Sequence, residues 1–240
     1  MKINTILTPA VVDELYFTGK TTIAIDVLRA TTTIIAALNN GAKEIIPVGS
    51  LEFVHKASGD TFGGKTIRGG EKNMKKIDGF DLGNSPLEYT RETIEGKSII
   101  FFTTNGTKAI TKAKYSTALY LMAFSNLDTV VNKFANYEGD FEIICAGRNN
   151  EISLEDAVCA GMLISKLREV RDDIELTDPA LIAYTLYWKF GKNIPALFDI
   201  AEHGKLLKEN GFYDDIKYCS QLSIIDKIPV FSNNSLKFLN

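Results

Sequence analysis

The chain has 240 residues, of which 45% are hydrophobic and 24% charged, which is ordinary for a globular protein with a substantial core. Its formal net charge of −3 argues against a surface that binds nucleic acid or an anionic membrane, because neither is attracted to a weakly acidic protein. We therefore expect no nucleic-acid partner and no membrane partner, while the bulk charge leaves room for a local basic pocket that binds a small anion.

Residues 1–17 contain Pro9, Asp13 and Glu14 where a signal peptide needs an unbroken apolar stretch. No apolar run approaches the roughly 20 residues that a membrane-spanning helix needs. We therefore expect a cytoplasmic protein.

The cysteines are odd in number and far apart, and they show neither a CxxC pair nor a Cys/His metal spacing: Cys145, Cys159 and Cys219. Their apolar surroundings predict buried free thiols in a reducing compartment. We expect none of them to be catalytic.

Short β-branched runs alternate with stretches of helical spacing, a pattern typical of an α/β fold. The predicted strands are residues 23–27, 44–48, 98–103, 118–122 and 141–145, with 229–231 as an edge strand. The predicted helices are residues 31–40, 51–57, 108–113, 127–135, 153–168, 178–190 and 195–203. No repeat, low-complexity tract or linker interrupts the pattern. We therefore predict a single compact domain over residues 1–240, a three-layer α/β/α fold around a mostly buried, mixed sheet. Whether it forms a homodimer stays open.

Residues 61–89 break this pattern, because they hold many glycines and few apolar residues that could pack. A long loop-rich segment inside a compact domain is usually functional or disordered. The polar side chains of Glu71, Asp81 and Asn84 favour the functional interpretation, so we expect an active-site loop segment here.

The first candidate segment lies at the end of the strand at 23–27 and contains Asp26, Arg29, Thr31 and Thr32. An arginine can grip two phosphate oxygens, and the first amides of the following helix favour negative charge. The alternative is structural: a threonine that caps the helix, and an ion pair between Asp26 and Arg29.

A second candidate loop, Thr103-Thr104-Asn105-Gly106-Thr107, follows the strand at 98–103. Gly106 lets the backbone approach a ligand closely, and the hydroxyl and amide groups add neutral donors. An ordinary turn and helix cap is the alternative, because Asn-Gly is a common turn dipeptide.

The third candidate segment runs from Cys145 and Gly147 to Ser153, Glu155 and Asp156. Two carboxylates in a first helical turn often only complement the helix dipole, and Ser153 with Asp156 suggests a capping box. Mg²⁺ sites, however, use one or two carboxylates together with phosphate oxygens of the substrate.

Several classes of phosphate-binding or phosphatase site are excluded because the chain lacks their sequence motifs. The chain has neither a Walker loop nor a G-x-G-x-x-G fingerprint. The D-x-D-x-T motif of haloacid-dehalogenase phosphatases fails because Leu28 stands two positions after Asp26. No cysteine has an arginine six positions on, and neither His55 nor His203 lies in an R-H-G motif. The remaining option uses carboxylates and a metal.

Taken together, these segments resemble the 2-phosphosulfolactate phosphatase (ComB) family over essentially the whole chain. The matching motifs are IDVLRATTTI (25–34), GGE (69–71), GFDLGNSPLEY (79–89), TTNGT (103–107) and CAG…SLED (145–156). A DI-x-x-C motif at residues 215–219 and Pro229 fit the family's carboxyl-terminal end. One departure is Lys72, where the family commonly has arginine after GGE. Lysine and arginine are not equivalent at anion sites, so the acid that is recognised can differ.

The resemblance implies Mg²⁺-dependent hydrolysis of 2-phosphosulfolactate to sulfolactate, a step in coenzyme M formation. We expect catalysis by positioning and charge neutralisation. The metal would be held by two or three of Asp26, Glu71, Glu155 and Asp156. The expected catalytic residues are Asp26, Arg29 and Asp81, with Asp81 orienting the loop or acting as an acid or base. The expected substrate-binding residues are Arg29, Thr31, Thr32, Lys72, Asn84, Ser85, Thr104, Asn105, Gly106 and Thr107.

Direct attack by water and a covalent aspartyl-phosphate at Asp26 both remain open. Two other function classes also stay open: a non-catalytic protein that binds a small anion, and an isomerase or lyase that acts on a phosphorylated acid. A phosphate-release assay across phosphorylated hydroxy acids, with and without Mg²⁺, separates these classes.

Overall fold

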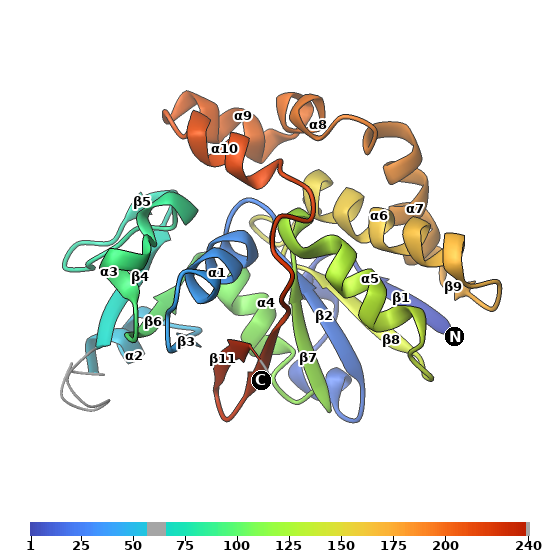
Figure 1. Ribbon diagram of the computed structural model, residues 1–240, viewed down its shortest axis with the longest axis horizontal. Helices are drawn as coiled ribbons and strands as arrows, with labels where there is room; N and C mark the ends of the chain where they lie inside the picture. Colours follow the sequence, from blue (N-terminus) through green and yellow to red (C-terminus); the bar gives the residue numbers. More distant parts are fainter. Residues whose placement is uncertain (57–65, 239–240) are drawn as a thin grey trace.

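The strands form one mixed sheet in the computed structural model, which describes residues 1–56 and 66–238 (Figure 1). The strands are β1 (Lys2–Ile6), β2 (Thr21–Ile25), β3 (Glu44–Pro47), β4 (Thr66–Lys72), β5 (Lys75–Lys76), β6 (Ser98–Phe102), β7 (Ala118–Met122), β8 (Phe141–Cys145), β9 (Glu175–Leu176), β10 (Pro229–Ser232) and β11 (Ser235–Phe238). Their order across the sheet is β5-β4-β6-β3-β11-β10-β7-β2-β8-β1-β9.

A carboxyl-terminal hairpin joins two parallel parts of this sheet. Strands β4, β6 and β3 are parallel to one another, and so are β7, β2, β8, β1 and β9. Between them, β10 pairs antiparallel with β7, and β11 pairs antiparallel with β3. The expectation of an edge strand at 229–231 is therefore wrong. Pro229 is tolerated inside the sheet because it is the first residue of β10, a position where a missing N–H does little harm.

The α-helices are α1 (Ala30–Asn39), α2 (Leu51–Lys56), α3 (Arg91–Ile94), α4 (Gly106–Lys112), α5 (Leu127–Ala135), α6 (Leu154–Val170), α7 (Asp178–Phe190), α8 (Ile194–Ile200), α9 (Glu202–Glu209) and α10 (Tyr213–Cys219). Short 3-10 turns lie at Pro9–Val11, Glu14–Phe17, Pro86–Glu88 and Phe124–Asn126. None of the helices in the described ranges is long and apolar enough to cross a membrane.

The predicted elements match the structure where periodicity was strong and differ where it was weak. The predicted helix 195–203 is divided, because the extended backbone at Ala201 ends α8 before α9 begins. The expectation of a loop-rich segment at residues 61–89 is wrong in part, because β4 and β5 lie there, while residues 61–65 fall outside the described residues. Ser153 is the N-cap of α6, but its side chain makes no capping hydrogen bond, so the expected capping box is absent.

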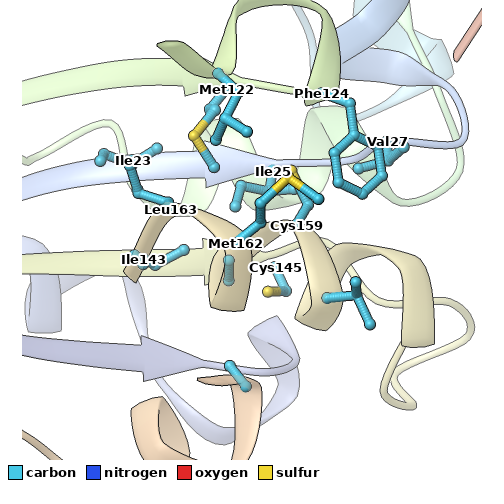
Figure 2. Packing of buried hydrophobic residues seen from close by; sticks show 14 of the residues in the cluster. Ile23, Ile25, Val27, Met122, Phe124, Ile143, Cys145, Cys159, Met162 and Leu163 are labelled. Carbon is cyan, nitrogen blue, oxygen red and sulfur yellow. The ribbon is translucent and has the colours of Figure 1, made fainter. Parts of the chain in front are cut away.

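Helix α6 packs on β2 and β8 through an apolar core (Figure 2). Successive side chains of a strand point to opposite faces of the sheet. Ile23 and Ile25 of β2 accordingly face α6, whereas Ala24 belongs to a cluster on the other face. In Figure 2, Cys159 and Leu163 of α6 lie directly against these strand side chains.

Helices α1 and α4 pack against both parallel parts of the sheet (Figure 1). Their apolar residues share one cluster with Ala24 and Leu121 on one side and with Ile45 and Ile99 on the other. Residues 30–38 of α1 are all buried. With α2 packed on the opposite face of β6, helices cover both faces of the sheet, and the predicted three-layer α/β/α fold is confirmed.

Helices α8, α9 and α10, residues Ile194–Cys219, group together at the top of Figure 1. We refer to them as the α8–α10 layer. They lie above the loops that follow β2 and β8, and so they can add side chains to whatever site those loops form.

Candidate active site

A pocket of about 230 Å³ lies where chain segments following β2, β4, β6 and β8 converge. In open α/β sheets, ligands bind at the carboxyl ends of the strands, which is where this pocket opens. The described residues that line it are Asp26, Leu28, Arg29, Glu71, Asn73, Met74, Asn84, Thr103, Thr104, Asn105, Arg148, Asn149 and His203.

Asp26 directly follows β2 and is only 7% exposed. Its Oδ1 accepts a hydrogen bond from the backbone N–H of Ala30 in the first turn of α1, at 3.2 Å. Burial is the main cause that raises the pKa of Asp26 to about 6, while the nearby His203 opposes this rise. The carboxyl groups of Glu71 and Glu155 raise the pKa further. Asp26 can therefore exchange a proton near neutral pH.

Thr31 and Thr32 are both buried and bond to the loop instead of lining the pocket. Thr31 Oγ1 donates to the carbonyl of Asp26 at 2.8 Å and accepts from its N–H at 3.0 Å. Thr32 Oγ1 donates to the carbonyl of Val27 at 2.8 Å. The N-cap of α1 is Arg29, so neither threonine caps the helix. Both hydroxyls hold the turn that presents Asp26.

Arg29 lines the pocket, and its guanidinium is held in place by residues of the α8–α10 layer. The side chain is 2% exposed, and its Nη1 donates to Oδ2 of the buried Asp215 of α10. The guanidinium also lies 4.1 Å from the ring centroid of Phe212. The expected alternative, an ion pair between Arg29 and Asp26, is not formed; the partner is Asp215.

The loop after β6 combines a turn that bonds to itself with half-buried donors that line the pocket. Thr107 and Thr103 bond to each other, with the Thr107 N–H donating to Thr103 Oγ1 at 3.0 Å. Thr104 and Asn105 line the pocket. A side chain at Gly106 would overlap Ala30 Cβ and the Asp26 carboxylate. Gly106 therefore allows the first turns of α1 and α4 to approach each other next to Asp26.

Glu71 lines the pocket, and its carboxylate accepts hydrogen bonds from both neighbouring loops. Oε1 accepts from the N–H of Thr104 at 2.8 Å, and Oε2 accepts from the N–H of Met74 at 2.6 Å. At this end of β4, Gly70 has a φ of +130°, and a side chain there would overlap the carbonyl oxygen of Phe102. Glu71 thus joins the loops that follow β4 and β6.

Glu155 and Asp156 are buried at the start of α6, behind the pocket. Asp156 accepts hydrogen bonds from the N–H groups of Val27 at 2.8 Å and Gly147 at 3.2 Å. Burial, with the carboxylates of Asp26 and Glu155, raises the pKa of Asp156 well above its usual range. Asp156 therefore ties the loops after β2 and β8 together.

Glu155 has a side-chain partner instead. Its Oε1 lies 3.5 Å from Nδ1 of His203. Burial raises the pKa of Glu155, but the neighbouring His203 and, to a lesser extent, Ser153 outweigh this effect, so the pKa lies below its usual range. Glu155 therefore lies beside the imidazole of His203, which lines the pocket.

Of the site residues predicted in the loop 79–89, one lines the pocket and the others lie around it. Asn84 lines the pocket, and its buried Oδ1 has no hydrogen-bond partner in the described part of the chain. Ser85 Oγ donates to Oδ1 of Asp215 at 2.6 Å. Asp81 is exposed and accepts from the N–H of Arg68 at 2.8 Å, so it orients β4, away from the pocket lining. Lys72 is also exposed and outside the pocket lining.

Three residues at or beside the pocket were not predicted from the sequence to be functional: Arg148, His203 and Asp215. Arg148 and His203 line the pocket, and Arg148 pairs with Glu202 of α9 at 2.6 Å. The CAG motif pointed to the loop that holds Arg148, and the DI-x-x-C motif contains Asp215. His203 had no signal besides being one of two histidines in the chain.

All three cysteines are free and fully buried. Burial raises the pKa of Cys145 and Cys159 well above the usual range, and that of Cys219 to about 12. The expectation of buried free thiols is confirmed, and none of these thiols lines the pocket in the described structure.

The expected metal ligands do not gather as one group. Among residues 1–56 and 66–238, no set of three His, Cys, Asp or Glu side chains could hold a metal ion. Two hard oxygen atoms nevertheless suit a divalent cation. They are Asn84 Oδ1 and Asp26 Oδ2, and neither takes a hydrogen bond from the described residues. These two oxygens are the candidates for a cation site with few protein ligands, and Mg²⁺ binding stays a prediction.

The comparisons with known proteins agree over nearly the whole chain. Residues 6–234 match the family model described as 2-phosphosulpholactate phosphatase. A "Probable 2-phosphosulfolactate phosphatase" of Clostridium beijerinckii is 39% identical, covering 98% of this chain and 99% of the relative. Proteins of the same name are 40% identical in Clostridium novyi, covering 96% of this chain and 97% of the relative, and 37% identical in Symbiobacterium thermophilum, covering 92% and 95%.

Proposed function

The chain belongs to the 2-phosphosulpholactate phosphatase family, and on that premise we propose that it hydrolyses the phosphate monoester of a small anionic acid. The substrate we propose is 2-phosphosulfolactate, cleaved to sulfolactate and inorganic phosphate. The observation that carries the proposal is that one pocket contains both the guanidinium of Arg29, held by Asp215, and the buried carboxylate of Asp26. A role in coenzyme M formation and a cytoplasmic location belong to the same proposal.

Arg29 is suited to hold the phosphate. In the described part of the chain, Asp215 is the only hydrogen-bond acceptor of its guanidinium, so other N–H groups remain for phosphate oxygens. A guanidinium can contact two oxygens at once, and these contacts strengthen as charge develops on the transferring group. Because Arg29 is held by Asp215 and Phe212, little reorganisation is needed when substrate binds.

Asp26 is the group best suited to act on the attacking water or on the phosphorus itself. Its pKa of about 6 lets it hold or release a proton near neutral pH. As a general base it would take the proton of the water; as a nucleophile it would form an aspartyl-phosphate that water then cleaves. Phosphate that stays on the protein after a rapid acid quench would identify the second route.

The charge balance of the pocket favours a bound cation. Asp26 and Glu71 face the pocket, while both arginines that line it already pair with carboxylates, Asp215 and Glu202. A multiply charged anion would be repelled unless positive charge were added. Asp26 and Asn84 would hold Mg²⁺, which when bound would neutralise phosphate charge and lower the pKa of a bound water.

Arg148 is better placed than Lys72 to meet the second anionic group of the substrate. Lys72 is exposed and outside the pocket lining, whereas Arg148 lines the pocket with a side chain that is 26% exposed. Arg29 is more deeply buried, at 2%. The two arginines therefore offer a deep position for phosphate and an outer position for carboxylate or sulfonate.

The test is a phosphate-release assay on 2-phosphosulfolactate, 2-phospholactate, 2-phosphoglycolate and an uncharged-tail ester, with Mg²⁺ or with a chelator. We expect the highest kcat/KM for 2-phosphosulfolactate and a loss of activity in chelator that Mg²⁺ restores. Rearranged or cleaved product without inorganic phosphate would show an isomerase or lyase. Binding without turnover of any ester would show an anion-binding protein.

A further inference from the structure

Asp215 connects three parts of the molecule that are far apart in sequence. Its Oδ2 accepts from Arg29 Nη1 in the loop after β2, and its Oδ1 accepts from Ser85 Oγ at 2.6 Å in the loop 79–89. All three residues are buried: Asp215 is 4% exposed, Arg29 3% and Ser85 8%. Asp215 itself lies on α10, in the α8–α10 layer.

This arrangement fixes the guanidinium of Arg29 on its edge and on its face. Asp215 holds one nitrogen of the plane, and the centroid of the Phe212 ring lies 4.1 Å from the guanidinium carbon. An arginine side chain that is free in solution has many rotamers and loses this freedom when it is ordered. Here that freedom is lost on folding, before any ligand binds.

Stability alone is a weak reason for such a pair. Removing two charges from water costs several kcal/mol for each ion, and a well-packed apolar pair is often equally stable or more stable. A buried ion pair beside a polar pocket is better explained by what it holds in place.

We propose that Asp215 is the positioning residue of the phosphate site: it aims the guanidinium of Arg29 into the pocket and, through Ser85, couples that aim to the loop that carries Asn84. The inference rests on the proposed function and deepens it. Asp215 lies outside the pocket lining in the described structure, so it acts on the phosphate only through Arg29.

The test compares Asp215→Asn with Asp214→Asn. Asp214 is its exposed neighbour in the same first turn of α10, so the control removes the same charge from the same helix end. We expect Asp215→Asn to lower kcat on 2-phosphosulfolactate by about 10- to 100-fold with KM changed much less, which is typical when an orienting partner is lost. Asp214→Asn should stay within about 2-fold of wild type, because rim charges far from chemistry contribute little.

A double variant separates positioning from a general effect on the fold. In an Arg29→Ala background, Asp215→Asn should cost no further activity, because its target is already gone. It should also restore part of the stability, because Arg29→Ala leaves Asp215 buried without its partner. A second full loss of activity in the double variant would overturn the proposal.

Two further measurements cover the remaining outcomes. If Asp215→Asn does not fold, Ser85→Ala removes only one of the two Asp215 anchors and should lower kcat in the same direction, whereas an unchanged kcat would overturn the proposal. If the wild type hydrolyses no ester, the proposed function fails, and calorimetric binding of inorganic phosphate then tests Asp215 directly. Weaker binding by Asp215→Asn than by Asp214→Asn supports the positioning role, and equal binding refutes it.

Discussion

Asp26 carries a buried carboxyl group whose pKa is raised from the ordinary value to about 6, mainly by burial. The folded state therefore binds this proton more tightly than the unfolded chain does. Stability should fall as the pH rises from about 4 to about 6, and the loss should be complete above that window. The difference between about 6 and the ordinary value corresponds to about 3 kcal/mol.

Asp26→Asn should therefore be more stable than wild type in chelator at pH 8, by up to about 3 kcal/mol, since the amide is never ionised. The advantage should shrink as the pH is lowered toward 4. Denaturant unfolding at both pH values measures this change, and phosphate release should be abolished throughout. An advantage that is the same at pH 4 and pH 8 would show that ionisation of Asp26 is not its cause.

The cysteines make a contrasting prediction. Each of Cys145→Ser, Cys159→Ser and Cys219→Ser should keep near-normal kcat, because burial raises the pKa of all three thiols and so disfavours a reactive thiolate. Stability should drop by about 1–3 kcal/mol when a hydroxyl is buried without a full set of partners. Turnover corrected for the folded fraction checks this, and complete inactivation of a folded variant would reveal a catalytic thiol.

Arg148 should determine selectivity for a second negative charge. Arg148→Ala should lower kcat/KM for 2-phosphosulfolactate by about 10-fold or more, the usual effect of losing a charged hydrogen bond. The same change should leave an ester with an uncharged tail nearly unaffected. Lys72→Ala is the matched control, since it removes an exposed cation outside the pocket lining. A selective loss with Lys72→Ala and none with Arg148→Ala would reverse the two assignments.

At the level of elements, the site depends on how closely α1 and α4 begin. Gly106→Ala would drive a methyl group into Ala30 and the Asp26 carboxylate, so we expect a destabilisation of about 1–3 kcal/mol and a lower kcat. Gly49→Ala is the matched control, because within residues 1–56 and 66–238 its new Cβ would meet only Thr111 Oγ1, at 3.5 Å. Melting temperatures and kcat of both variants check the prediction. Equal behaviour of the two would show that the approach of α1 to α4 is not critical.

Elements with strong periodicity could be predicted from the sequence, and others could not for physical reasons. The strand at 141–145 and the helix at 127–135 have the predicted bounds, since their apolar spacing is unambiguous. Strand β4 was missed because TIRGGEK is polar and glycine-rich; it forms because it pairs with β6. The break at Ala201 carries neither glycine nor proline, so nothing local announces the start of α9.

At the level of the whole molecule, the pocket is assembled from segments that local patterns cannot bring together. The expectation that ligands bind at the carboxyl ends of the strands correctly predicted that Asp26, Thr104 and Asn105 lie in one pocket. It could not foresee that Asp215, from the α8–α10 layer, would be the partner of Arg29, because 186 residues separate the two. The carboxylates at 155 and 156 looked like ligands in sequence, but the fold uses them to bind His203 and two backbone amides.

Arg29 is one of the residues that join the strand-end loops to the α8–α10 layer, and it is also the proposed phosphate contact. Replacing it should therefore affect both stability and catalysis. Arg29→Ala leaves Asp215 buried without its partner, which commonly costs about 3–5 kcal/mol. Activity must accordingly be expressed per folded molecule.

The most direct measurement is kcat/KM for phosphate release from 2-phosphosulfolactate by wild type, Arg29→Ala and Arg29→Lys, with melting temperatures determined on the same samples. We expect a loss of about 10²–10³ in Arg29→Ala per folded molecule, the usual cost of deleting one transition-state donor. Arg29→Lys should recover only part of this loss, because an ammonium group cannot make the two-oxygen contact. A destabilised Arg29→Ala protein with wild-type kcat/KM per folded molecule would contradict the phosphate role of this pocket.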